Sequence, residues 1–278
     1  MNDSVYTIIL HHPARPSSCL MRTLLSLQGA TKTNCHVVDV IVQGVKRKSS
    51  EVKGLELRYA EVGKNIGIGG GFKLGVKRFL KSNAKWLLKV DDDIVVPRLG
   101  ADILRMAIKE ERSVNKRKLG GIMMATKKTR TRILVKGVST NNIPYVKPVD
   151  GRRGIGKQRF FGCDVRWIIT DFTDIGCTLY SRELFDDGCI PDEALFVGGI
   201  GLDLVLQGDA LGYSWAVCIN PQCDHYNLDC HTDEYRGIRS NRAVYRRSLA
   251  YFYRKWGIVP IPLATAAGKL SPGGKIEL

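Results

Sequence analysis

The sequence predicts a single α/β domain built on a mixed, mainly parallel β-sheet, and two observations support this fold class. Short apolar runs rich in Val, Ile and Leu alternate along the chain with segments whose apolar residues recur at helical spacing. The chain has 278 residues, of which 44% are hydrophobic and 25% charged, which suits one globular domain with a sizeable core. In such alternating folds, ligands bind at the carboxyl ends of the parallel strands.

The first half of the chain carries the clearest pattern. Apolar, β-rich runs predict strands at residues 5–10, 36–43, 55–62, 86–90 and 121–125. Apolar residues at helical spacing predict helices between the first two strands, over residues 72–80, and after Pro97.

The second half differs in character. Segment 127–166 contains eleven Lys or Arg residues and little periodicity, which predicts an irregular basic excursion. Apolar patterning returns at Trp167, and a helix with an arginine-rich face is expected over 242–256. Residues 258–278 are expected to form a C-terminal tail. Its last part, GKLSPGGKIEL at 268–278, is rich in Gly, Pro and Lys and is expected to be frayed.

The composition points to an anionic partner. The formal net charge of +16 suits a nucleotide diphosphate, a phosphorylated acceptor, an anionic membrane surface or nucleic acid. No apolar run is long enough to span a bilayer and no signal peptide is apparent, so a cytoplasmic protein is expected, with peripheral membrane contact as an addition. The eight cysteines are scattered without a C-x-x-C pair and are expected to be buried thiols.

Three aspartates follow the predicted strand at 86–90 directly. Adjacent carboxylates at Asp91, Asp92 and Asp93 repel one another unless a cation neutralises them. Hard divalent cations take carboxylate oxygens and leave positions open for phosphate oxygens. In an extended segment the first and third aspartates point the same way. The triplet therefore predicts a site for Mn²⁺ or Mg²⁺ and a diphosphate, with a solvated acidic turn as the alternative.

A glycine-rich segment precedes the triplet. Its glycines would let backbone amides approach an anion at the start of a helix, and Lys73 would add positive charge. The residues predicted to contact such an anion are Asn65, Gly67, Gly70, Gly71 and Lys73. The alternative is a glycine-rich turn that only caps a helix.

Together, in this order, the two motifs resemble glycosyltransferase family 2, especially its rhamnosyl- and galactofuranosyltransferase-like members with the GT-A fold. That family shows N-x-G-x-x-G-G-x-x-x-G, then a strand, then D-x-D, as residues 65–75 and 91–93 do here. The resemblance continues through the segments at 174–182, 191–196 and 212–225, and it covers about residues 5–257.

The resemblance implies a GT-A-like, Rossmann-type nucleotide-binding fold in one domain over 1–257. Residues 1–125 would form the nucleotide-sugar-binding half, 126–166 the basic excursion and 167–257 the acceptor and catalytic half, with 258–278 as a tail. It also implies inverting, metal-dependent transfer of a sugar from a nucleotide-diphosphate donor to a hydroxyl of a glycan, polysaccharide or lipid-linked acceptor.

The resemblance also assigns roles to individual residues. Asp91 would face the nucleotide ribose and the metal, Asp93 would ligate the metal, and His225 would complete the protein ligands. Asp92 would lie among the donor-binding residues. His11, where the family has a polar turn, is expected to contact a pyrimidine base.

The chain departs from the family at the catalytic base. The family carries an acidic residue five positions after the phenylalanine that corresponds to Phe196, and this chain has Gly201 there. Asp203, two residues on, is the first candidate for the base. Asp174 and Asp192 are the other candidates. Gln43 replaces a further acidic residue of the family at the end of the second strand.

Two rival functions fit parts of the pattern. A nucleotidyltransferase would also use aspartates, a metal and glycines, but would release pyrophosphate from a nucleoside triphosphate. A basic nucleic-acid-binding protein on a degenerate enzyme fold would explain the charge. The sequence has no RNP-like aromatic motif, zinc module or helix-turn-helix to support nucleic-acid binding.

Overall fold

The computed structural model describes residues 4–32, 36–44, 51–126, 132–140, 143–150, 155–170, 175–226, 232–271 and 276.

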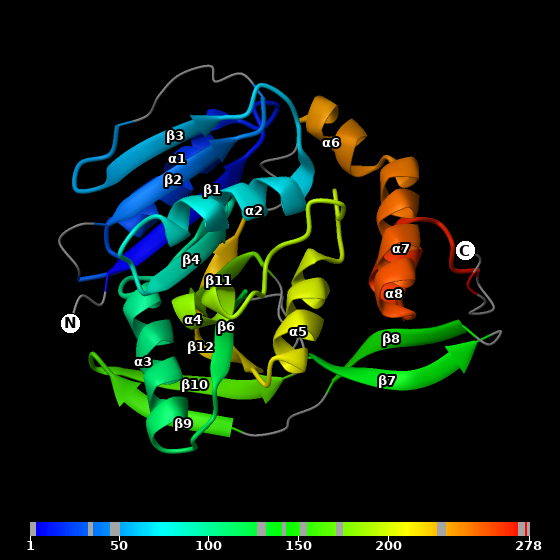
Figure 1. Ribbon diagram of the computed structural model, residues 1–278. Coiled ribbons are helices and arrows are strands. Elements are labelled where there is room, and N and C mark those ends of the chain that lie inside the picture. The colour runs from blue at the N-terminus through cyan, green and yellow to red at the C-terminus, as the bar shows by residue number, and fades with distance from the viewer. Residues whose placement is uncertain are drawn as a thin grey trace.

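A ten-stranded mixed sheet runs through the molecule (Figure 1). Its strands are β1 (Val5–His11), β2 (Val37–Val42), β3 (Glu56–Glu61), β4 (Trp86–Asp91), β5 (Ile94–Val95), β6 (Leu119–Thr126), β9 (Ile155–Phe160), β10 (Cys163–Thr170), β11 (Cys177–Ser181) and β12 (Ser214–His225). The spatial order is β3-β2-β1-β4-β11-β6-β12-β10-β9, and β5 pairs with β12. Along this order only β11 and β10 run against the others, so the sheet is mainly parallel, as the sequence predicts.

Helices cover both faces of the sheet. Apolar side chains of α1 (Ser17–Leu27) and α3 (Gly100–Ser113) join one core cluster with one face of the sheet. The opposite face packs in a second core cluster against α2 (Gly67–Leu80), α4 (Arg182–Asp186), α5 (Ile200–Ala210), α7 (Arg242–Trp256) and α8 (Ile261–Ala266). The strands of both predicted halves therefore share one sheet between two helical layers.

Two segments are more regular than the sequence predicts. The basic excursion contains strands: β7 (Arg132–Thr140) and β8 (Ile143–Asp150) form a hairpin, and β9 with most of β10 forms another. The expected C-terminal tail contains β13 (Val259–Pro260), which pairs with β8 in a separate three-stranded sheet below α7 and α8 (Figure 1). Leu263 and Ala264 of α8 are buried in the core, which explains why this segment is ordered.

The cysteines agree only in part with the expected thiols. Of the cysteines that the structure describes, five are free, and four of these are buried: Cys177, Cys189, Cys218 and Cys223. Cys19, in contrast, is disulfide-bonded. In the described part of the chain, no helix combines the length and apolar character that crossing a membrane requires.

Candidate functional site

Strand register brings the aspartate triplet and both predicted histidines to one edge of the sheet. β1 and β4 are parallel neighbours, with Leu10 opposite Asp91, so His11 lies beside the residues that follow β4. The chain then turns into β5, which pairs with the end of β12 and sets Ile94 opposite His225. The Tyr226 backbone amide donates to the Asp93 carbonyl over 2.9 Å.

Protein cations compensate each carboxylate of the triplet. The Arg15 guanidinium donates to both Asp92 and Asp93, and the Lys89 ammonium pairs with Asp91. Lys89 is itself fully buried within β4. The repulsion that suggested a metal ion is therefore relieved first by the chain's own side chains.

Two of the three predicted metal ligands meet. His225 Nε2 lies 3.2 Å from Asp93 Oδ2. Burial raises the pKa of Asp93, but the hydrogen bond from His225 and the charge of Arg15 outweigh it and hold that pKa well below its usual range. The other oxygen, Asp93 Oδ1, is buried and has no hydrogen-bond partner among the described residues. A carboxylate oxygen left in this state beside an imidazole fits a divalent cation.

Asp91 and Asp92 are placed differently. The Asp91 side chain is 36% exposed and pairs with Lys89, and the described residues contain no group of three side chains that could hold a metal. The role of Asp91 as a third ligand thus stays a prediction. Asp92 is 1% exposed, and its two oxygens contact Arg15 and His11, the latter at 2.7 Å. Its contacts favour an anchoring role for Asp92.

The amides at the start of α2 bind the protein itself. The Ile68 amide donates to the Phe196 carbonyl over 2.8 Å, and the Gly69 amide donates to the Leu195 carbonyl over 3.3 Å. A Cβ at Gly69 would lie 2.2 Å from the Asp192 carbonyl oxygen. These amides, at the end of the helix expected to meet an anion, are used to dock the segment at 192–196.

The other glycines let α2 lie close to the sheet. A Cβ at Gly75 would lie 2.7 Å from Ile8, and one at Gly71 would lie 3.1 Å from both Gln43 and Leu10. Gly67 has a φ of 73°, and its amide donates to the Asn65 side chain over 2.9 Å.

Two further residues of the segment also have contacts within the protein. The atoms nearest to a Cβ at Gly70 belong to the Ile66 side chain, the first at 3.2 Å, and Lys73 pairs with Glu193 at 2.9 Å. The segment therefore has structural reasons for its composition, and its contact with a donor stays a prediction.

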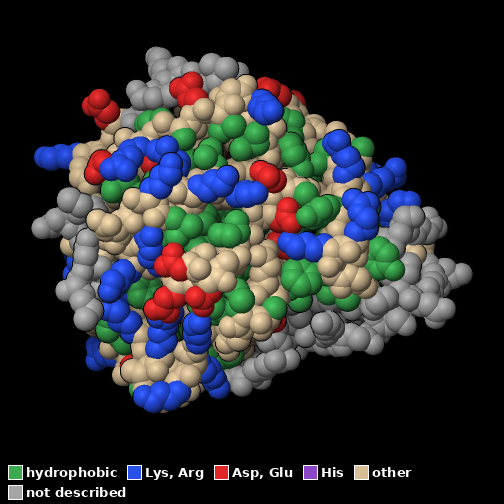
Figure 2. Space-filling model, in the orientation of Figure 1, with side chains coloured by type: hydrophobic (Ala, Val, Ile, Leu, Met, Phe, Trp, Pro, Cys, Tyr) green, Lys and Arg blue, Asp and Glu red, His purple; other side chains and the backbone are tan. Residues whose placement is uncertain are grey.

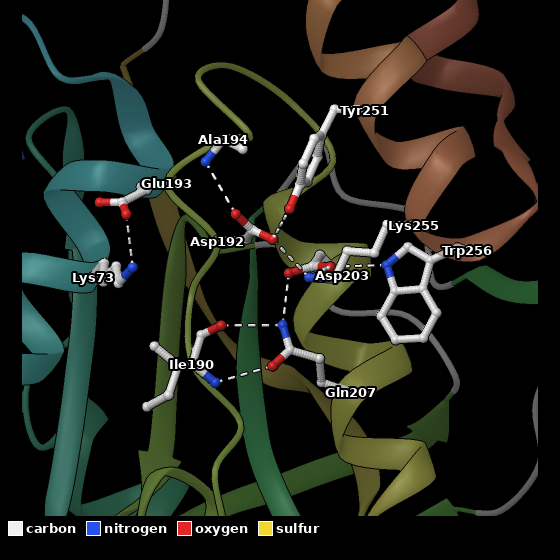
Figure 3. A network of polar contacts seen from close by, with 10 residues as sticks. All are labelled: Lys73, Ile190, Asp192, Glu193, Ala194, Asp203, Gln207, Tyr251, Lys255 and Trp256. Atoms are coloured by element: carbon white, nitrogen blue, oxygen red, sulfur yellow. Dashed lines mark hydrogen bonds and ion pairs between the residues drawn. The ribbon is translucent and has the colours of Figure 1, made fainter.

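A second polar cluster joins α5 and the segment at 190–194 to α7 within the predicted acceptor half (Figure 3). Asp203 lies on α5 and is fully buried. Its Oδ1 accepts a hydrogen bond from Trp256 Nε1 at 2.8 Å and pairs with Lys255 at 2.7 Å, while its Oδ2 accepts from Gln207 at 2.7 Å. Because both oxygens are already engaged, these contacts favour a structural role for Asp203 over the predicted catalytic base.

The other candidate bases are not better placed. Asp192 accepts from the Tyr251 hydroxyl and pairs with Lys255, each at 2.8 Å. Burial lowers the pKa of Lys255, but its hydrogen bonds to Asp192 and Asp203 outweigh it and raise that pKa, so the lysine stays charged. Asp174 lies outside the described residues, and its role stays a prediction.

Sequence reasoning missed the cations of both clusters. Lys89 had a signal: a single lysine in an otherwise apolar strand (W-L-L-K-V), two residues before Asp91, must share a face with it and needs a partner. Arg15 and Lys255 had no such signal, because their partners are distant in the sequence. The carboxylates that contact Arg15 lie 77 and 78 residues away, and those that contact Lys255 lie 52 and 63 residues away.

Solved structures share this fold at low sequence identity. TarS 1–349 from S. aureus in complex with UDP has a TM-score of 0.54 and 12% identity, covering 90% of this chain and 65% of its own. GalNAc-T7 with UDP, GalNAc and Mn²⁺ has a TM-score of 0.53 and 12% identity, covering 80% of this chain and 43% of its own. The chain thus spans less than two thirds of either structure. Both are glycosyltransferases with GT-A-like folds, so the predicted fold is confirmed.

Comparison of structures found similar proteins, but comparison of sequences found none. No protein-family model matches the chain, and no curated protein matches it in sequence. Membership of glycosyltransferase family 2 and its rhamnosyl or galactofuranosyl specificity therefore stay predictions.

Proposed function

We propose that this chain is a nucleotide-sugar-dependent glycosyltransferase whose donor diphosphate binds at the edge formed by the ends of β1, β4 and β12. The observation that carries the proposal is that His11 contacts Asp92, and His225 contacts Asp93, at the carboxyl edge of a GT-A-like sheet. This is the edge at which α/β folds bind their ligands. The complexes of TarS and GalNAc-T7 with UDP support a uridine-type donor.

Asp93 and His225 would hold a Mn²⁺ or Mg²⁺ ion. Magnesium commonly takes only one or two protein carboxylates and fills its other positions with phosphate oxygens and water, so two protein ligands suffice. When bound, the cation would neutralise the charge that develops on the departing diphosphate. Asp91, which pairs with Lys89, would face the ribose, while His11, which contacts Asp92, would contact the base.

The acceptor would be a hydroxyl of a glycan or of a lipid-linked sugar. Its oxygen would attack the anomeric carbon of the donor with inversion, and the nucleotide diphosphate would leave. A carboxylate is needed to take the hydroxyl proton. Since Asp203 is buried and paired, Asp174 becomes the first candidate for that base, and Asp203 holds α5 against α7.

Contact with an anionic membrane would bring such an acceptor to the enzyme. Four exposed arginines of α7 take part in no ion pair among the described residues: Arg242, Arg246, Arg247 and Arg254. Of these, Arg246 also donates a hydrogen bond to the Ala267 carbonyl over 3.2 Å. Figure 2 shows basic side chains gathered on this part of the surface. α7 contains no acidic residue to offset them.

The decisive experiment measures UDP binding by calorimetry with Mn²⁺ and with EDTA. Wild type is expected to bind UDP more tightly with Mn²⁺, and Asp93→Asn is expected to lose that enhancement because the substitution removes the anionic ligand. Asp186→Asn, which changes an exposed aspartate on α4, is the matched control and should behave as wild type. Mn²⁺-independent binding in all three proteins would contradict the metal–diphosphate site.

The rival nucleotidyltransferase is separated by product analysis. A glycosyltransferase should release UDP from a UDP-sugar and leave nucleoside triphosphates intact. Release of pyrophosphate from a nucleoside triphosphate would favour the rival instead.

A further inference from the structure

We propose that Arg15 is a positioning residue for the metal–diphosphate site, holding the Asp93 carboxylate so that one oxygen stays available beside His225. This inference rests on the proposed function of the same site. Arg15 lies in the turn after β1, four residues beyond His11, and its side chain is 6% exposed.

The guanidinium bridges two carboxylates. Its Nη1 donates to Asp92 Oδ1 and its Nη2 donates to Asp93 Oδ2. Such a planar fork fixes the direction of each hydrogen bond, which the single ammonium of a lysine cannot do. The orientation of the Asp93 carboxylate is therefore tied to that of Asp92.

Arg15 is itself held in place from the other side. The Tyr235 ring of α6 (Asp233–Arg239) lies 4.9 Å from the guanidinium carbon. The Thr232 hydroxyl, at the N-cap of α6, donates to the Ala14 carbonyl. The same tyrosine lies 5.7 Å from the His12 ring. Helix α6 thus packs over the turn that presents Arg15.

This arrangement leaves one oxygen for a ligand. Arg15 and His225 both contact Asp93 Oδ2, while Asp93 Oδ1 is buried without a hydrogen-bond partner among the described residues. An unpaired buried carboxylate oxygen costs free energy unless a ligand satisfies it. Outer partners that orient metal ligands typically contribute about 10–100-fold to metal affinity.

The test separates orientation from charge. Arg15→Lys retains the positive charge but loses the fork, and Arg78→Gln is the control, since Arg78 likewise pairs with a buried carboxylate, Asp39, outside the site. UDP affinity is measured by calorimetry with Mn²⁺ and with EDTA, and folding by thermal unfolding. The Mn²⁺ enhancement should fall about 10–100-fold in Arg15→Lys. Arg78→Gln should lose thermal stability and keep the full enhancement.

A second variant covers the case in which Arg15→Lys does not fold. Arg15→Gln combined with Asp92→Asn removes one charge of each sign and restores the balance, and its enhancement should still be reduced. A wild-type enhancement in either folded Arg15 variant would overturn the positioning role. Absence of any Mn²⁺ enhancement in wild type would instead overturn the proposed function, and this inference with it.

Discussion

The carboxylates of the triplet Asp91–Asp93 differ in their partners, and their expected roles differ for that reason. Asp91 has Lys89, Asp92 has Arg15 and His11, and Asp93 shares Arg15 with His225. Breaking a buried ion pair leaves an uncompensated charge, so Asp92 is expected to matter for folding. Asp93 differs because one of its oxygens has no partner among the described residues. The triplet therefore joins a structural anchor to a ligand-binding group within three consecutive residues.

His36 predicts a pH dependence of stability. It is 3% exposed, its Nδ1 lies 3.3 Å from the Leu27 carbonyl and its Nε2 contacts the Thr7 hydroxyl. Burial lowers the pKa of His36 from 6.5 to about 4. Between these values the unfolded chain binds a proton that the folded chain does not. The contribution of His36 is therefore complete above pH 6.5 and is lost as the pH falls toward 4, by about 3 kcal/mol in total.

The measurement is the free energy of unfolding of wild type and His36→Asn in denaturant, from pH 7.5 to pH 4, expressed as a difference between the two. The asparagine keeps a donor for the Leu27 carbonyl and does not titrate. The stability advantage of wild type should shrink as the pH falls. Parallel curves would show that His36 is not held neutral.

At the scale of elements, α2 contacts both segment 192–196 and the sheet. Its amino end docks the segment at 192–196 through backbone hydrogen bonds, and its glycines let it approach β1. The same segment is tied to α7 through Asp192 and Lys255 (Figure 3). The glycine-rich segment, α5 and α7 therefore form one packed unit on one face of the sheet.

Gly69 should tolerate no side chain. In Gly69→Ala the new Cβ would meet the backbone carbonyls of Asp192 at 2.2 Å and Leu195 at 2.6 Å, and backbone cannot move aside as a side chain can. We expect a loss of about 1–3 kcal/mol or more in the free energy of unfolding. Gly70→Ala is the matched control in the same helix turn, since the atoms nearest to its Cβ belong to the Ile66 side chain and not to backbone.

Chemical denaturation of both variants checks this prediction. Gly70→Ala should lie within about 1 kcal/mol of wild type, because alanine favours the helix. Equal stability of the two variants would show that the docking of segment 192–196 on α2 is looser than these contacts indicate.

Over the whole molecule, the net charge of +16 is distributed unevenly. Some cations form ion pairs with carboxylates inside the protein. Lys89 and Arg15 do so at the triplet, and Lys255 does so between α7 and α5. The α7 arginines at 242, 246, 247 and 254 take part in no ion pair among the described residues. Basic side chains thus lie on α7 and also on other parts of the surface that Figure 2 shows.

The four arginines of α7 should make the protein bind anionic vesicles. Removing all four arginines, by Arg242, Arg246, Arg247 and Arg254→Gln, should weaken binding by about 1 kcal/mol for each charge that reaches the surface. The control has the same net charge and changes four exposed lysines elsewhere: Lys53, Lys64, Lys81 and Lys85→Gln. Vesicle sedimentation with phosphatidylserine, compared with neutral lipid and with added salt, measures the effect. Equal loss in both variants would reduce the effect to net charge alone.

Local pattern was enough for most of the strands and for the position of the triplet. Apolar runs and helical spacing depend on neighbouring residues, so β1, β2, β3, β4 and β6 fall where the sequence predicts them. Position at the end of β4 likewise places Asp91–Asp93 at the carboxyl edge. Local pattern did not predict β7, β8 and β13, because these strands are stabilised by pairing with one another.

Only the tertiary structure decided which groups meet which. Arg15 contacts two carboxylates that lie 77 and 78 residues away, and Lys73 contacts one that lies 120 residues away. Local sequence patterns therefore cannot predict these pairs. The glycine-rich segment shows the same limit. Its composition allows another group to approach the backbone closely, but only the packing determines that carbonyls of segment 192–196 accept hydrogen bonds from the amides of Ile68 and Gly69. The path of the chain at Asp203 is likewise helical, and burial against Lys255 and Trp256 follows from the docking of α7. Contacts between distant segments depend on how whole elements pack, and that information is not local.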